Sequence, residues 1–101
     1  MYTVFSTFDV PPEKSEEVIA IYQNRSRRVD RADGFVDFLL LQNERRPGEL
    51  TVQLIFDSKE NYLNWARSAE FREIHELEKN YPDQELAAIV PKISKYKVVA
   101  G

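Results

Sequence analysis

Residues 35–41, FVDFLLL, are apolar on both of the faces that a β-strand would present. Because side chains alternate along a strand, one face carries Val36, Phe38 and Leu40, and the other carries Phe35, Leu39 and Leu41. Such a strand is normally buried on both sides. We expect the 101 residues to form one domain, in which a single helical layer covers only one face of the sheet. The second face predicts a sheet from another subunit, and hence a homodimer.

Three further segments show the period-two alternation of a strand: residues 2–10, 50–56 and 93–99. In the first of them, one expected face carries Tyr2, Val4, Phe8 and Val10, and the other carries Thr3, Thr7 and Asp9. The prolines at positions 11 and 12 end this strand, because proline cannot donate to a strand ladder.

Two helical segments separate the predicted strands. The first covers residues 13–30, with glutamates near its start and arginines near its end, as the helix dipole favours. The second begins at Asp57-Ser58, breaks at Ser68-Ala69 and ends at residues 81–83. The resulting β-α-β-β-α-β order predicts an α+β fold, a ferredoxin-like antiparallel sheet with helices on one face. This fold hosts many functions, so the function must come from particular residues.

Composition narrows the class of protein. Apolar residues make up 43% and charged residues 31% of the chain, as in an ordinary globular protein. A net charge of −3 argues against a general nucleic-acid binder, and the lack of cysteine excludes thiolate metal ligands and disulfides. Neither a secretion signal nor a membrane-spanning apolar run is evident. We therefore expect a cytoplasmic protein that does not enter the membrane.

His75 is the only histidine in the chain. Zinc and non-heme iron sites built from several imidazoles are thereby excluded within one subunit. Two chemical roles stay open, which are general acid–base catalysis and ligation of a heme iron through one nitrogen. The alternative is a solvated helix residue without a ligand.

Trp65 lies ten residues before His75 and is the only tryptophan. A lone tryptophan most often anchors a core, because its ring buries a large apolar area. Four arginines, Arg25, Arg27, Arg28 and Arg31, cluster where the first helix is expected to end. They fit a solvated helix terminus, and one of them could also bind a ligand carboxylate through its guanidinium fork.

Two stretches of the sequence resemble a known family. Residues 56–75, FDSKENYLNWARSAEFREIH, and residues 29–42, VDRADGFVDFLLLQ, resemble the conserved pattern of antibiotic biosynthesis monooxygenase domains. With the opening strand and the Val10-Pro11 step, the resemblance covers nearly the whole chain. The spacing from Trp65 to His75 is similar to that of the heme-degrading monooxygenases within this superfamily.

The resemblance implies a dimeric α+β barrel that binds heme. His75 would be the proximal ligand of the heme iron, and Trp65 would lie against the porphyrin. Tyr22, Arg25 and Phe71 would line the heme pocket, with Arg25 as the candidate for a propionate. In the family this activity opens the porphyrin with O₂ and external electrons and releases iron.

One position departs from the pattern of the heme degraders, which carry an asparagine on the first strand. Here Ser6 aligns with it, or Thr7 if the register shifts by one residue. A hydroxyl can donate a hydrogen bond, but it reaches less far than an amide. The catalytic set implied for this chain is therefore Ser6, Trp65 and His75.

Two other functions stay open. In a cofactor-independent monooxygenase, Ser6, Trp65 and His75 would line an apolar pocket for a polycyclic aromatic phenol. In a non-catalytic dimeric ligand-binding module, Trp65 and His75 would be structural.

Overall fold

The computed structural model describes residues 1–79 and 82–101. Its sheet contains four antiparallel strands in the order β2-β3-β1-β4. The strands are β1 (Tyr2–Asp9), β2 (Phe35–Gln42), β3 (Glu49–Phe56) and β4 (Lys92–Lys97). The helices are α1 (Ser15–Gln23), α2 (Lys59–Ala66), α3 (Ala69–Lys79) and α4 (Gln84–Ala87). This order confirms the predicted α+β, ferredoxin-like architecture.

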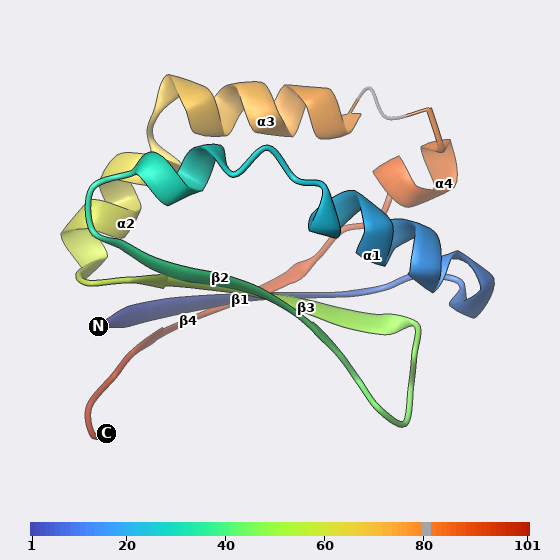
Figure 1. The fold of residues 1–101 in the computed structure, drawn as a ribbon, viewed down its shortest axis with the longest axis horizontal. Helices are drawn as coiled ribbons and strands as arrows, with labels where there is room; N and C mark the ends of the chain where they lie inside the picture. Colours follow the sequence, from blue (N-terminus) through green and yellow to red (C-terminus); the bar gives the residue numbers. More distant parts are fainter. Residues whose placement is uncertain (80–81) are drawn as a thin grey trace.

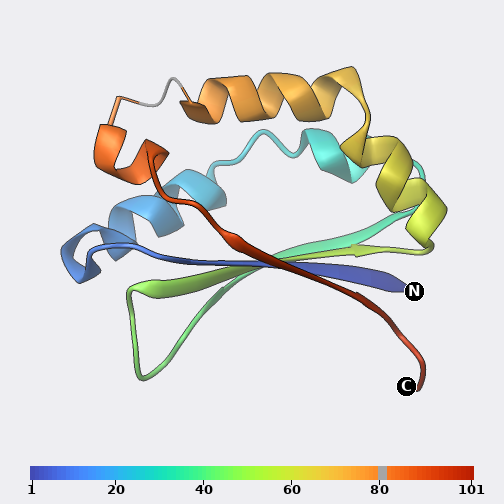
Figure 2. The same ribbon diagram turned by 180° about the vertical axis from the view of Figure 1, so that it is seen from behind.

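All four helices lie on one side of the sheet, and both ribbon views leave the other side without a helix (Figures 1 and 2). We call these the helix face and the open face. Side chains directly opposite one another in a strand pair share a face. The β1 alternation is as expected, because Val4 and Phe8 pack into the hydrophobic clusters on the helix face. The Oγ1 atom of Thr7, on the open face, lies 2.9 Å from that of Thr51.

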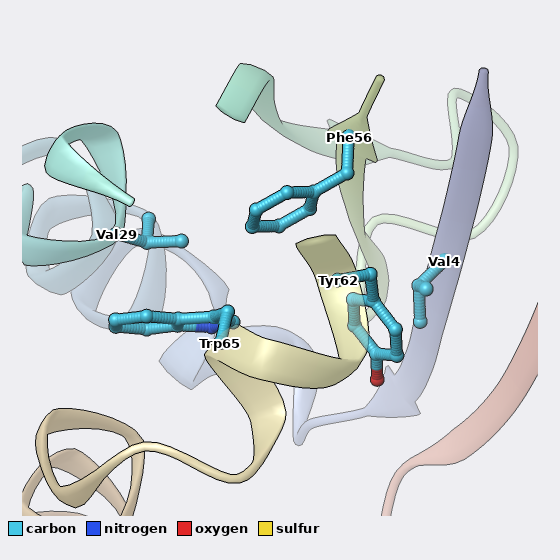
Figure 3. Packing of buried hydrophobic residues seen from close by; sticks show 5 residues of the cluster. All are labelled: Val4, Val29, Phe56, Tyr62 and Trp65. Atoms are coloured by element: carbon cyan, nitrogen blue, oxygen red, sulfur yellow. The ribbon is translucent and has the colours of Figure 1, made fainter. Parts of the chain in front are cut away.

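The hydrophobic core between sheet and helices consists of two clusters. The first contains the buried residues Val4, Val29, Phe56, Tyr62 and Trp65 (Figure 3). The second contains Val10, Val18 and Leu50. β3 connects them, because Leu50 and Phe56 lie at its two ends and are completely buried. The central strands thus hold both ends of the helical layer.

A β-bulge corrects the faces expected for β2. The pairing register with β3 shifts between Phe35 and Asp37. This irregularity places Phe35 on the helix face, where its ring meets that of Phe56 edge-on at 6.2 Å. The expectation that Phe35 and Phe38 occupy opposite faces was therefore wrong, because one extra residue breaks the strict alternation. Leu39 and Leu41 lie on the open face, as expected.

The first helix is shorter than predicted, because α1 ends at Gln23 and not near residue 30. The backbone N–H and the side-chain amide of Asn24 both donate to the carbonyl of Ala20. These bonds satisfy the helix end, as side-chain amides commonly do. Arg27 then adopts the left-handed conformation, with φ of 58°, and a 3₁₀ turn follows over Arg28–Arg31.

The predicted start and break of the second helical region are confirmed. The backbone N–H of Asn61 donates to the Ser58 hydroxyl and caps α2. The helix end was predicted at residues 81–83, of which Tyr81 lies outside the described residues. The short helix α4 was not predicted, and it begins where Asp83 accepts hydrogen bonds from two backbone N–H groups. No helix in the described parts of the chain has the length and apolar character needed to cross a bilayer.

Candidate active site

His75 lies on the exposed side of α3, with one ring nitrogen already engaged. Its Nδ1 lies 3.0 Å from the carbonyl oxygen of Phe71, one helical turn earlier. A carbonyl oxygen only accepts hydrogen bonds, so the bond places the proton on Nδ1 and leaves the Nε2 lone pair free in the neutral ring. Fixing one imidazole nitrogen on a carbonyl is the usual way in which proteins orient a histidine that binds metal. The expectation of an exposed helix residue is confirmed, and the geometry also suits a ligand.

Trp65 is buried at the end of α2, with 9% of its surface exposed. Figure 3 shows the side chain of Val29 beside the indole, within the first core cluster. The expected core role is thus confirmed. Phe71 meets the indole edge-on, with ring centroids 6.1 Å apart.

Phe71 connects Trp65 to His75. Its ring centroid lies 4.1 Å from that of the imidazole, so the three aromatic rings form a continuous row from the core to the surface. We call Trp65, Phe71 and His75 the aromatic row. Because only the ring of Phe71 lies between them, a displacement of Trp65 in the core would also move the imidazole of His75.

One hydroxyl group fixes the turn that creates the aromatic row. Ser68 donates to the carbonyl of Trp65 at 2.6 Å and accepts from the backbone N–H of Phe71 at 3.2 Å. The first bond closes the end of α2, and the second caps the start of α3. The sequence identified the break at Ser68, but not its role in aligning the rings.

Tyr22 and Arg25 lie together in a cleft of about 520 Å³ between α1, the 3₁₀ turn and β2. The ring of Tyr22 stacks between those of Phe8 and Phe38, each 6.2 Å away. Burial raises the pKa of Tyr22 to about 12, and the carboxylate of Glu78 on α3 adds to the shift. Tyr22 therefore remains a neutral hydroxyl at physiological pH.

Arg25 lies in the loop after α1, not on the helix as expected. Its guanidinium lies 4.0 Å above the ring centroid of Phe38 and forms two hydrogen bonds to Asp30, at 2.9 and 3.3 Å. Arginine carries five N–H donors, so this pairing leaves others for a ligand. Phe38 links the cleft to the aromatic row, since it also packs against the core cluster that contains Trp65.

Ser6 lies on the helix face, in the middle of β1. Its neighbours across the sheet are Val52 on β3 and Ile93 on β4. Ile93 is 58% exposed although it lies on the helix face, so the helices leave this strip of the sheet uncovered. Thr7 lies on the open face, where its hydroxyl meets that of Thr51, so the two hydroxyls that could align with the family asparagine lie on opposite faces of the sheet.

The structure thus distributes the expected residues over three places, which are the aromatic row, the cleft at Tyr22 and Arg25, and the strip at Ser6. Sequence reasoning missed Phe38 and Asp30, which hold Arg25. It had no signal for them, because both contacts depend on the loop after α1. Within residues 1–79 and 82–101, no group of three or more histidine, cysteine, aspartate or glutamate side chains is arranged to hold a metal ion.

Comparison with known proteins identifies the family. The sequence profile described as antibiotic biosynthesis monooxygenase matches residues 1–77. This chain belongs to that family. The match confirms the resemblance carried by residues 29–42 and 56–75. Among relatives of this antibiotic biosynthesis monooxygenase (ABM) chain, a protein of Halalkalibacterium halodurans described as a heme-degrading monooxygenase is 30% identical over 105 residues. That alignment covers 100% of this chain and 86% of the relative.

Solved structures share the ABM fold. The heme degrader MhuD from Mycobacterium tuberculosis, solved with two hemes bound in its active site, gives a TM-score of 0.79 at 18% identity. The match covers 100% of this chain and 98% of that one. A conserved protein from Methanosarcina mazei Go1 gives a TM-score of 0.69 at 23% identity, over 95% and 90% of the two chains. At such identities the structures show a common fold and no more.

Proposed function

We propose that this ABM protein is a monooxygenase of the heme-degrading type, which binds heme through His75. The observation that carries the proposal is the free Nε2 lone pair of His75, on an exposed ring whose Nδ1 is fixed on the carbonyl of Phe71. The family of the chain and its 30% identity to a heme-degrading relative agree with this reading.

The residues on the helix face fit a flat, apolar ligand that carries carboxylates. His75 would bind the iron, and Phe71 and Trp65 would offer aromatic edges to the ring. Arg25 would bind a propionate through the N–H groups that Asp30 leaves free, and the neutral Tyr22 beside it would donate a hydrogen bond. Bound heme would supply both the iron that activates O₂ and the porphyrin that is oxidised, with electrons from an external reductant.

Ser6 is the proposed hydrogen-bond donor on the sheet side. Its strip is uncovered and otherwise apolar, with Val52 and Ile93 on either side. A flat ligand that covers the strip would exclude water from it, and a hydroxyl that donates in such a low-dielectric place acts more strongly than it would in water. Trp65 would hold the ligand in place from the core, because its indole is fixed by Val29 and Phe71.

We also propose that a second copy of the chain covers the open face. Large apolar side chains remain exposed there, among them Leu39, Leu41 and Tyr96. Leu41 and Tyr96 line a shallow hollow of about 540 Å³ together with Phe5 and Thr51. A contiguous apolar patch on a sheet is typical of a protein–protein interface. The doubly apolar β2 strand predicts the same homodimer.

Turnover tests the proposed activity. Purified protein loaded with hemin is given ascorbate in air, with catalase present to remove free peroxide. We expect the Soret band to decay and iron to become accessible to a ferrous chelator. A stable Soret band under these conditions would contradict degradation, even if hemin binds. Oxygen uptake with an anthrone-type phenol and no heme would instead support the cofactor-independent alternative.

A further inference from the structure

Arg28 joins the 3₁₀ turn after α1 to two carboxylates of α3. Its Nε lies 3.4 Å from Oε2 of Glu70, and its Nη2 lies 2.5 Å from Oε2 of Glu73. Its immediate neighbour, Val29, is buried in the core cluster beside Trp65. The backbone of Arg28 is therefore anchored to the core, while its side chain holds a different element.

The core holds α3 along only part of its length. Phe71 and Ile74 pack against the first core cluster, but Leu77, one turn later, is 69% exposed. At about 100° of rotation per residue, Ile74 marks the side of α3 that faces the core. Glu70 and Glu73 then lie on one flank of that side, and Phe71 and His75 lie on the other. A contact on the Glu70 flank thus opposes rotation of the helix about its axis, with Ile74 as the pivot.

We propose that Arg28 is a positioning residue, whose bridge to Glu70 and Glu73 sets the rotation of α3 and thereby the direction of His75 Nε2. The inference rests on the proposed role of His75 as the heme ligand. The ion pairs of Arg28 are with Glu70 and Glu73, neither of which is assigned to the ligand. Exposed ion pairs add little to global stability, so removing the bridge should leave the fold intact while it changes the direction of the imidazole.

Charge reversal tests the proposal. Arg28→Glu replaces the attraction to both carboxylates by repulsion, and Arg28→Glu with Glu73→Arg restores one attraction in the opposite sense. Arg31→Glu, in the same 3₁₀ turn, makes the same change of net charge and serves as the matched control. Thermal unfolding of all variants checks that the fold is retained.

The first measurement needs no heme. With a single histidine in the chain, tag-free protein gives one set of imidazole NMR signals, and these are assigned without ambiguity. We expect Arg28→Glu to shift the His75 ring signals and to weaken the nuclear Overhauser contacts to the Phe71 ring. The double variant should restore both, and Arg31→Glu should match the wild type.

The second measurement is hemin affinity, read from the Soret band. We expect Arg28→Glu to weaken binding about fivefold, a usual size for a residue that acts through another, and the double variant to recover most of the loss. If the wild type binds no hemin through His75, the proposed function fails, and the NMR comparison alone decides the role of Arg28. Unchanged His75 signals in Arg28→Glu would overturn the inference. A loss that Glu73→Arg does not rescue would overturn it as well.

Discussion

The carbonyl oxygen of Phe71 lies 3.0 Å from Nδ1 of His75, and the two rings of these residues pack 4.1 Å apart. The same residue therefore contacts the imidazole with its tilted ring and selects the tautomer with its backbone carbonyl. Phe71 in turn rests on Trp65, so the direction of His75 depends on the core. This relationship separates His75 from an ordinary solvated histidine, because its second nitrogen is kept free in a defined direction.

The first prediction concerns the core end of the aromatic row. Trp65→Ala should lower the free energy of unfolding by about 3–5 kcal/mol, because it leaves a large cavity among Val29, Phe56 and Phe71. Urea unfolding followed by circular dichroism measures the effect. Leu77→Ala, at an exposed position, is the control and should change stability by about 0.5 kcal/mol or less. Equal effects from the two variants would show that the indole is not a core anchor.

Ser6→Asn places the residue typical of heme degraders at its aligned position. We expect faster Soret decay with ascorbate and hemin affinity within about twofold of the wild type, because an amide reaches further than a hydroxyl. Thr7→Asn is the matched control and should not accelerate decay, since Thr7 lies on the open face against Thr51. If Thr7→Asn accelerates Soret decay and Ser6→Asn does not, the hydrogen-bond donor lies on the open face, and the proposed role of Ser6 is wrong.

The buried hydroxyl of Tyr22 should lower the free energy of unfolding in alkaline solution. Burial raises its folded-state pKa to about 12, against about 10 for an unfolded tyrosine. The unfolded chain therefore releases this proton first. The stabilising effect is complete below about pH 10 and disappears progressively between about pH 10 and pH 12. Unfolding free energies across this range should decline less steeply for Tyr22→Phe, which keeps the stacked ring. Identical slopes for the two proteins would show that the hydroxyl is not buried.

The open face predicts the oligomeric state. Sedimentation velocity should show a dimer for the wild type, and Leu41→Glu should shift it toward the monomer, because it buries an unpaired charge in the interface. Val90→Glu is the control, since Val90 is exposed and lies outside the hollow on the open face. A wild-type monomer at all concentrations would contradict the proposed homodimer.

Much of the fold was predictable because it follows from local sequence patterns. Strand alternation placed β1 and β3 correctly, and Ser58 and Ser68 marked the starts of α2 and α3. The bulge at Phe35 escaped prediction, because an apolar residue fits either face of a strand that is apolar on both. The early end of α1 was not predicted either, because no residue type in 24–30 excludes a helix. The end depends on the hydrogen bonds of Asn24 and on the left-handed backbone of Arg27.

The candidate site was less predictable than the fold. Its individual members, His75 and Trp65, stood out because each is the only residue of its type in the chain. Their connection through Phe71 and the bridge from Arg28 to Glu73 depend on how two helices and a turn pack together. Arg28 looked like any other member of a basic cluster, because the sequence gives no sign of which arginine reaches α3.

Hemin titration of the wild type and of His75→Ala tests the central claim most directly. Arg72→Ala, a second truncation on the same helix at an exposed position, controls for the loss of a side chain. We expect a saturable complex with a defined Soret band for the wild type and for Arg72→Ala. For His75→Ala we expect the loss of that band and its partial return when free imidazole is added. If His75→Ala binds hemin with the same affinity and the same spectrum as the wild type, His75 is not the ligand, and the proposed heme site is wrong.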